Sequence, residues 1–299
     1  MQKYLFILLL LIFSCDEPVI EGCTTSTACN YSVDADKDDG SCVAPEGCNE
    51  WCEGDTTIVL ELDCIGECGG TLVKDCANIC DGTAVVDADE NCYATVQIGE
   101  QLWMAENLKV THYQNGDEIP TGYTGSEWHE LETGAYAVYD DDLSNANIYG
   151  NLYNWFSVDD DRGVCPEGFH VPSEYEWIEL EIFMGISESE ANSIGWRGTD
   201  EGGRLKSTGT IEGGDGLWSM PNEGATNKSG FTALPGGCSY GGDSYGLFSY
   251  MSYYCIFWST TVSNSNFVWT RIISYSSSQI GRDDDFIKQQ GFSVRCLKD

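Results

Sequence analysis

The sequence is poor in basic residues. Of its 299 residues only 14 are Lys or Arg, against 49 Asp or Glu, so the formal net charge is −35 at pH 7. A chain of this charge is repelled by a phosphate backbone, which argues against nucleic acid as a partner. The acidity is explained by solubility and by mutual repulsion of the molecules. Binding of divalent cations by surface carboxylates is the alternative.

Long apolar runs are also missing, because no stretch approaches the roughly twenty residues needed to cross a bilayer. The longest apolar run, Tyr4–Phe13, follows Lys3 and ends before the small residue Ser14. This arrangement is typical of a secretory signal peptide, which we predict at residues 1–14. We expect no other part of the chain to span a membrane.

The residues at the predicted cleavage point, Ile12-Phe13-Ser14-Cys15, resemble a bacterial lipobox. The resemblance implies that the thiol of Cys15 carries a diacylglycerol, whose acyl chains partition into a membrane. Residues 15–22 would then form a lipidated tether; a plain signal peptide followed by a stray cysteine is the alternative. Asp16-Glu17 resembles the acidic stretch that directs Bacteroidota lipoproteins outward. We therefore expect an outer-membrane lipoprotein of the cell envelope, exposed at the cell surface.

Cysteine, in contrast, is abundant. Apart from Cys15 there are fourteen cysteines, and ten of them lie between Cys23 and Cys92. An even number in an exported chain predicts disulfides. Zinc binding is the alternative, and the presence of only three His argues against it. The clustering divides the mature chain into a Cys-rich module, residues 23–92, and a second module, residues 93–299.

The Cys-rich module contains a repeat of twelve residues. Cys64–Asp75 and Cys76–Asp87 each have a Cys-x-x-x-Cys motif, a glycine and a short apolar stretch, and Cys48–Asp63 is a looser copy. Units this short cannot form a hydrophobic core. We therefore expect stacked turns held by disulfides, with little regular structure and with a connectivity that the spacing leaves open.

An acidic segment lies near the start of this module, in a stretch from Cys23 to Cys42 that resembles one common in surface proteins of Bacteroidota. Calcium is the only cofactor that the sequence suggests, because acidic residues alternate here as in a calcium loop, at Asp34, Asp36, Asp38 and, next to them, Asp39. However, Asp39 displaces the required glycine to Gly40, and no acidic residue closes the loop at its twelfth position. An acidic turn without a metal is the favoured interpretation.

From Tyr93 onward, short segments rich in aromatic residues and glycine alternate apolar and polar side chains. This pattern predicts strands at residues 95–98, 134–139, 267–273 and 292–296. Residues 198–250 are Gly-rich and are predicted to form a long loop region.

One helix is predicted between these strands. Ser173 and Glu176 have the spacing of a capping box, and Gly185 ends the helix. The apolar face consists of Trp177, Leu180 and Met184. A second, shorter helix is expected from Ser187, where Ser187 and Glu190 repeat the box.

Five spaced motifs of the second module are specific enough to indicate a family, namely Val96–Leu108, Cys165–Trp177, Gly230–Gly237, Trp258–Thr260 and Ser293–Cys296. Together they resemble the Fibrobacter succinogenes major paralogous domain over residues 93–299. That family is similar to the formylglycine-generating enzyme and to C-type-lectin-like folds. The resemblance implies an α+β fold with a small twisted antiparallel sheet, one or two helices and long Gly-rich loops.

The same resemblance implies how the last four cysteines pair. Cys165 with Cys296 would be the outer bridge of a lectin-like domain, and Cys238 with Cys255 the inner bridge that holds the long loops. The sequence departs from the lectin plan in that Cys165 precedes the helix instead of lying within it.

Residues for catalysis are scarce. An oxidase of the formylglycine-generating type needs two closely spaced redox-active cysteines, whereas Cys238 and Cys255 are 17 residues apart. The three histidines, at 112, 129 and 170, have no spacing suited to iron, and the sequence reveals no acidic partner for His170. Pro221-Asn222 and Trp258 match only fragments of the calcium-dependent sugar site of lectins. The sequence therefore predicts a protein that is not an enzyme.

Aromatic residues are numerous, with 9 Trp and 16 Tyr. We expect the tryptophans of strands and helices to be buried. Tyrosines of the Gly-rich loop region are candidate ligand-binding residues, because their rings stack on sugars or on a protein partner; they are Tyr240, Tyr245, Tyr250, Tyr253 and Tyr254.

Two functions follow from these observations. The first is noncatalytic binding or adhesion to an extracellular glycan or protein through the lectin-like domain, with the Cys-rich module as a spacer. The second is an enzyme of unknown reaction on a scaffold like that of the formylglycine-generating enzyme. The absence of a recognisable nucleophile, base or metal set favours the first.

Overall fold

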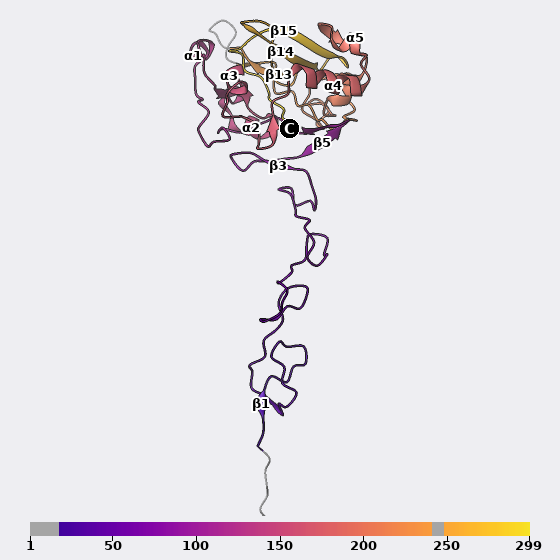
Figure 1. The fold of residues 1–299 in the computed structure, drawn as a ribbon. Helices are drawn as coiled ribbons and strands as arrows, with labels where there is room; N and C mark the ends of the chain where they lie inside the picture. Colours follow the sequence, from indigo (N-terminus) through magenta and orange to yellow (C-terminus); the bar gives the residue numbers. More distant parts are fainter. Residues whose placement is uncertain (1–17, 241–247) are drawn as a thin grey trace, which may run out of the picture. The chain divides into compact units, whose positions relative to one another are not determined.

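The computed structural model describes residues 18–240 and 248–299. The predicted signal peptide, Cys15 and Tyr245 lie outside the described residues. The chain forms two compact units, Met1–Val73 and Lys74–Asp299, each of which is considered separately (Figure 1). None of the helices in the described part of the chain is long and apolar enough to cross a membrane.

The first unit has little regular structure, as the sequence predicts. A parallel pair, β1 (Glu21–Gly22) and β2 (Lys37–Asp38), is its one named sheet within the described residues. Three disulfides hold the rest, and they join Cys23 to Cys42, Cys29 to Cys52 and Cys48 to Cys68. Cys64 is disulfide-bonded as well. Covalent bonds therefore do here what a hydrophobic core does in larger units.

The repeat has a local physical explanation. In the first unit, Oδ1 of Asp63 accepts hydrogen bonds from the amides of Ile65 and Glu67, which closes the turn at the next cysteine pair. A β-carbon on Gly70 would lie 2.0 Å from the Asp63 carboxylate, so only glycine fits there. Asp75 and Gly82 repeat this arrangement in the second unit, with the corresponding distance at 1.9 Å.

The second unit includes the last repeat. Cys76 is bonded to Cys92, and β3 (Val85–Val86) pairs with β4 (Cys92–Tyr93). The Tyr93 hydroxyl donates to Asp87 at 2.6 Å and accepts from the amide of Lys109 at 3.0 Å. The compact unit thus begins within the Cys-rich module, at Lys74.

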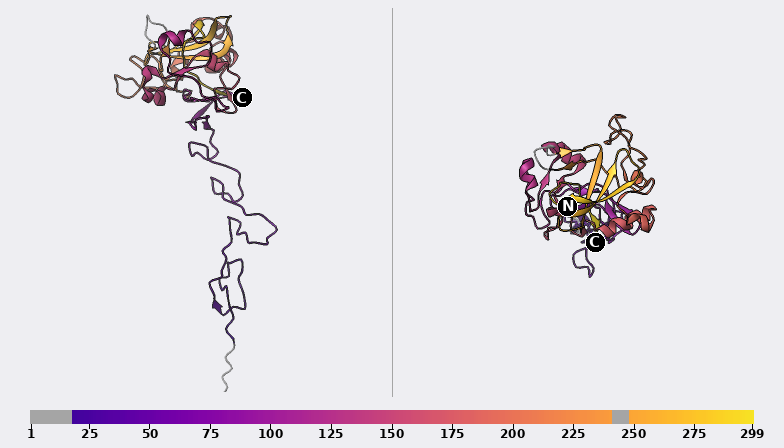
Figure 2. Two further views of the ribbon diagram at one scale, coloured as in Figure 1. Left: turned by 90° about the vertical axis from the view of Figure 1, so that its left-hand side faces the viewer. Right: turned by 90° about the horizontal axis from the view of Figure 1, so that it is seen from above.

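Two four-stranded antiparallel sheets organise the second unit (Figures 1 and 2). The first has the order β10 (Gly195–Arg197), β15 (Ile280–Ile287), β14 (Phe267–Ser274), β13 (Tyr254–Val262). The second has the order β5 (Thr95–Ile98), β6 (Gln101–Met104), β16 (Leu297–Lys298), β9 (Phe169–His170). Two small pairs add β7 (Tyr136–Ala137) with β8 (Leu152–Tyr153), and β11 (Cys238–Ser239) with β12 (Phe248–Ser249).

The helices are more numerous than the one or two expected. The structure has α1 (Gly125–His129), α2 (Leu143–Tyr149), α3 (Trp155–Val158), α4 (Glu174–Met184), α5 (Glu188–Ala191) and α6 (Glu201–Leu205), and the short 3-10 helix η1 (Tyr139–Asp141). The fold is therefore a mixed one with small antiparallel sheets. In Figure 1, α1 to α3 lie on one side of the β13–β15 sheet and α4 and α5 on the other.

Helix α4 forms as predicted. Ser173 accepts from the amide of Glu176, and the Glu176 carboxylate accepts from the amide of Ser173, which completes the capping box. Gly185 ends the helix with a φ of 118°, a left-handed conformation that favours glycine. The predicted apolar face is buried against the core.

Two strand predictions need correction. Residues 292–296 form isolated bridges at Phe292 and Ser293, and the only regular strand of this end is β16. The strand expected at 134–139 shortens to β7, since η1 follows it directly. In both places the apolar residues are largely buried, although the backbone forms no continuous ladder of hydrogen bonds with a neighbouring strand.

The core of the second unit is aromatic. Trp103, Trp177, Phe231 and Phe257 pack with centroids 4.8 to 6.0 Å apart, and Trp258 packs on Phe292 at 4.5 Å. These side chains are almost completely buried. Burial of large rings is the main source of stability in a unit of this size.

A buried network of ion pairs joins α4 to the first sheet. Glu181 accepts hydrogen bonds from Arg197 of β10 at 2.6 and 2.9 Å and from Arg271 of β14 at 2.5 Å. Glu174 accepts from Arg271 at 2.7 and 3.0 Å and from Arg282 of β15 at 2.5 Å. Each charge therefore has a partner of opposite sign.

The structure contains one of the two disulfides that the resemblance implies. Cys165, ahead of β9, is bonded to Cys296, next to β16. Cys238 and Cys255 are free thiols, which contradicts the expected inner bridge. Although Gly237 pairs with Cys255, the Cys238 side chain belongs to one core cluster and the Cys255 side chain to the other. The two thiols therefore face different parts of the core.

Candidate functional site

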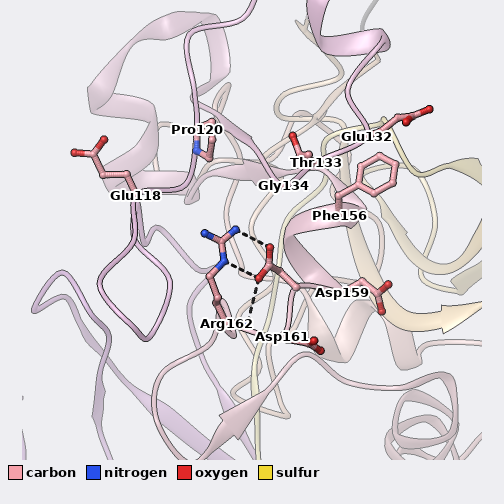
Figure 3. A pocket seen from close by; sticks show the side chains of 10 residues that line it. Glu118, Pro120, Glu132, Thr133, Gly134, Phe156, Asp159, Asp161 and Arg162 are labelled. Carbon is pink, nitrogen blue, oxygen red and sulfur yellow. Dashed lines mark hydrogen bonds and ion pairs between the residues drawn. The ribbon is translucent and has the colours of Figure 1, made fainter.

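A cavity of about 650 Å³ opens on the second unit between the loop before α1, the loop after α1 and the turn that follows α3 (Figure 3). We call it the acidic cavity. Its lining residues are Glu118, Pro120, Glu132, Thr133, Gly134, Phe156, Asp159, Asp160, Asp161 and Arg162. Five of these residues carry a carboxylate, and one, Arg162, carries a guanidinium.

The guanidinium of Arg162 is held by two aspartates and an aromatic ring. It donates to both carboxylate oxygens of Asp160 at 2.8 Å and to Asp117 at 3.1 Å, and it stacks on the ring of Tyr113 at 3.9 Å. The hydrogen bonds from Arg162 hold the pKa of Asp160 below its usual value, so this carboxylate stays ionised. The remaining carboxylates leave the cavity with a net negative charge.

Burial raises the pKa of Asp159 above its usual value, and the nearby Lys288 opposes that shift. Lys288 lines a second cavity of about 520 Å³, which shares Glu132 and Phe156 with the acidic cavity. This second cavity also contains the amides of Asn266 and Gln289. The partly exposed ring of Phe156 lines both cavities, and it offers an apolar surface between the carboxylates of the first and the ammonium and amide groups of the second.

The structure brings together three of the five tyrosines predicted to bind a ligand. Tyr240 contacts Tyr250, and Tyr250 contacts Tyr254, edge to face at 6.0 and 5.4 Å. Tyr253 packs on Tyr275 instead. Tyr250 and Tyr253 are 48% and 44% exposed, so these two rings are available at the surface.

The four aspartates considered for calcium do not gather around one point. Asp38 accepts from the amide of Gly40 and Asp39 from that of Ser41, so these two carboxylates close turns, whereas Asp36 accepts from the amide of Ile20, 16 residues away. Across residues 18–240 and 248–299, no group of three or more His, Cys, Asp or Glu side chains is arranged to hold a metal ion. Asp34, Asp36, Asp38 and Asp39 therefore do not form such a group in this structure, and calcium binding by them stays a prediction.

A carboxylate and an imidazole that are far apart in the sequence meet at the last repeat. Asp89 Oδ1 lies 2.5 Å from His112 Nδ1, and Asp89 Oδ2 accepts from the Thr111 hydroxyl at 2.8 Å. Burial raises the pKa of Asp89, but the hydrogen bonds from Thr111 and His112 outweigh it and lower the pKa. Sequence reasoning missed this pair because 23 residues separate its members.

His170 has two acidic partners that the sequence did not reveal. Its Nε2 lies 2.9 Å from Glu176 and its Nδ1 lies 2.7 Å from Asp299. The hydrogen bond to Glu176, more than that to Asp299, raises the pKa of His170 to about 9, although burial opposes it. The imidazolium therefore links the start of α4 to the end of β16 and serves the fold.

Comparisons with known proteins give one match. The model of the family described as the Fibrobacter succinogenes major domain matches residues 96–298. No curated protein matches the chain, and no solved structure does. The match covers the acidic cavity, the tyrosines and both free thiols.

Proposed function

The chain belongs to the Fibrobacter succinogenes major domain family, and on this premise we propose that it is a noncatalytic surface protein that binds an extracellular glycan or protein. Its disulfides support an extracellular location, because such bonds persist in oxidising compartments. The anchor is a lipid on Cys15, and the membrane is the outer one.

The observation that carries the binding function is that Phe156 lines two cavities. The ring supplies an apolar face on which a sugar ring or an aliphatic side chain packs. Around it, carboxylates accept hydrogen bonds from hydroxyl or amine groups, Lys288 donates them, and the amides of Asn266 and Gln289 both donate and accept. A ligand pocket combines these features.

We also propose that the domain is distantly related to C-type-lectin-like domains and to the formylglycine-generating enzyme. The Cys165–Cys296 bridge, which ties the region ahead of α4 to the last strand, supports this relation. The free thiols at Cys238 and Cys255 are a departure from the lectin plan.

Binding is tested with the mature chain carrying Cys15→Ala, screened on a glycan array and on extracellular matrix proteins. We expect a ligand whose affinity falls about tenfold or more in Phe156→Ala, whose ring lines both cavities. Tyr175→Ala is the matched control, since Tyr175 is a 68% exposed ring on α4, away from this site. Tyr250→Ala tells whether the tyrosines contribute.

Two results would contradict this proposal. Binding to no glycan or protein would remove the function itself. Equal losses in Phe156→Ala and Tyr175→Ala would place the ligand elsewhere on the domain.

An enzyme is the second candidate, and the Asp89–His112 pair favours it. A carboxylate that holds Nδ1 of an imidazole leaves Nε2 to act as a base, as in many hydrolases. If bound ligands are chemically changed on incubation, and His112→Ala abolishes the change while Phe156→Ala weakens binding, the protein is an enzyme. Unchanged ligand by mass spectrometry excludes this candidate.

A further inference from the structure

We infer that the first unit keeps its two ends covalently joined after cleavage of any single peptide bond between Cys23 and Cys68. The basis is the order of its bridges along the chain. Cys29 lies inside the loop that Cys23 and Cys42 close, and Cys48 lies inside the loop that Cys29 and Cys52 close. Successive loops therefore overlap.

Because the loops overlap, every peptide bond between Cys23 and Cys68 is spanned by at least one bridge, which the number of disulfides alone would not ensure. Bonds from Cys23 to Cys42 are spanned by the first bridge, bonds up to Cys52 by the second, and bonds up to Cys68 by the third. If each cysteine were bonded to its nearest neighbour in sequence, the bonds from 29 to 42 and from 48 to 52 would have no bridge across them. The observed connectivity leaves none uncovered.

The first unit is accessible to proteases, and the bridges determine whether the chain stays joined after it is cleaved. Its apolar side chains include Ile58 at 75% and Leu62 at 61% exposure, and residues 53–57 are all exposed. Segments with exposed side chains and few backbone hydrogen bonds are the usual sites of proteolytic cleavage. After such a cut, the bridges still join the second unit, with any ligand that it has bound, to the N-terminal end of the chain.

This retention is useful only if the protein is anchored at Cys15, and in that respect it rests on the proposed function. The covalent property itself does not depend on the anchor. It is therefore tested on the purified mature chain with an N-terminal tag and no membrane, where failure of lipidation has no effect.

The test places a recognition sequence for a site-specific protease between Thr56 and Thr57, which the Cys48–Cys68 bridge alone spans among the bridges of the described residues. After cleavage we expect one band on a nonreducing gel and two bands on a reducing gel. The control carries the same sequence between Val19 and Ile20, ahead of every bridge, and loses its tag without reductant. Separation of the chain cut after Thr56 without reductant would overturn the inference.

Two further measurements test the inference independently of the first one. Adding Cys48→Ser and Cys68→Ser should let the chain cut after Thr56 separate without reductant; continued joining would mean that another bond carries the connection and would also overturn the inference. Lys37 is the only Lys or Arg between Cys23 and Cys68, and two bridges span it. A tryptic cut there should leave the chain joined even in Cys23→Ser/Cys42→Ser.

Discussion

Cys238 and Cys255 remain thiols in a protein whose other described cysteines are bonded. Both are fully buried, and burial raises the pKa of each to about 12, so neither forms a thiolate at neutral pH. Because the thiolate is the reactive species, both side chains are chemically inert in the folded state.

We therefore predict that a thiol reagent finds no reactive cysteine in the native Cys15→Ala chain and two after denaturation without reductant. The readout is the mass added to the intact chain, followed by peptide mapping to Cys238 and Cys255. A denatured chain that adds no label would mean that the two are bonded to each other after all.

His170 contributes stability that depends on pH. Its pKa is raised from 6.5 to about 9 by its two carboxylate partners, so the contribution is complete below pH 6.5 and is lost as the pH rises through 9. The side chain is 37% exposed, and solvent screening keeps the effect small. We predict a loss of about 1–3 °C in the melting temperature across this range.

His170→Gln should remove most of this pH dependence, because glutamine has no charge to lose. NMR titration of the His170 ring would give the pKa directly. A midpoint near 6.5 would contradict the two ion pairs, since an isolated imidazole titrates there.

At the scale of elements, α4 is held to the sheet by charge as much as by apolar contact. The Glu181 carboxylate has no exposed surface and serves two guanidiniums, those of Arg197 and Arg271. Removing it leaves two buried cations short of a partner. Glu181→Ala should therefore destabilise the protein by about 3–5 kcal/mol, which denaturant unfolding would measure.

Glu188→Ala is the matched control for that prediction. Glu188 is exposed on α5, and no ion pair of its carboxylate is recorded among the described residues, so its loss should change stability by less than about 0.5 kcal/mol. Similar losses of stability in Glu181→Ala and Glu188→Ala would show that the buried ion pairs contribute no more to stability than an exposed carboxylate does.

The sequence predicts a structural feature when the residues that determine the feature lie close together in the chain. Helix α4 was predicted because Ser173, Glu176 and Gly185 act within one helix. The second box was wrong in detail: helix α5 begins after Ser187, but Ser187 makes no capping bond, and Glu190 accepts instead from the amide of Gly198. A tertiary contact outweighed the local one.

Site residues follow the same rule. Tyrosines of one loop region were predicted together, and Tyr240, Tyr250 and Tyr254 do lie together. The acidic cavity was not foreseen, since Glu118, Glu132 and Arg162 meet only when three separate segments fold against each other. Nor does spacing along the chain reveal that Cys238 and Cys255 face different core clusters.

For the whole molecule, the distribution of charge is more uneven than its net value suggests. Five basic side chains of the second unit are buried, namely Arg197, Lys206, Arg271, Arg282 and Arg295. Most acidic residues are exposed. The surface is therefore more negative than composition alone implies, which keeps copies apart.

Attachment to the membrane is the prediction that concerns the whole chain. If Cys15 carries a diacylglycerol, cells grown with labelled palmitate should label the wild-type protein, and Cys15→Ala should be unlabelled and found in the soluble fraction. Equal labelling of the two proteins would refute lipidation at Cys15. A plain signal peptide predicts no label in either.

The overlapping bridges also set how far the first unit extends under tension. The shortest covalent path from Cys23 to Cys68 crosses one bridge to Cys42, follows six residues to Cys48 and crosses a second bridge. Pulled straight, that path is about 30 Å long, against about 150 Å for the same chain without bridges. If the chain is anchored at Cys15 and binds a ligand, a force on that ligand would therefore reach the anchor after only a small extension of the first unit.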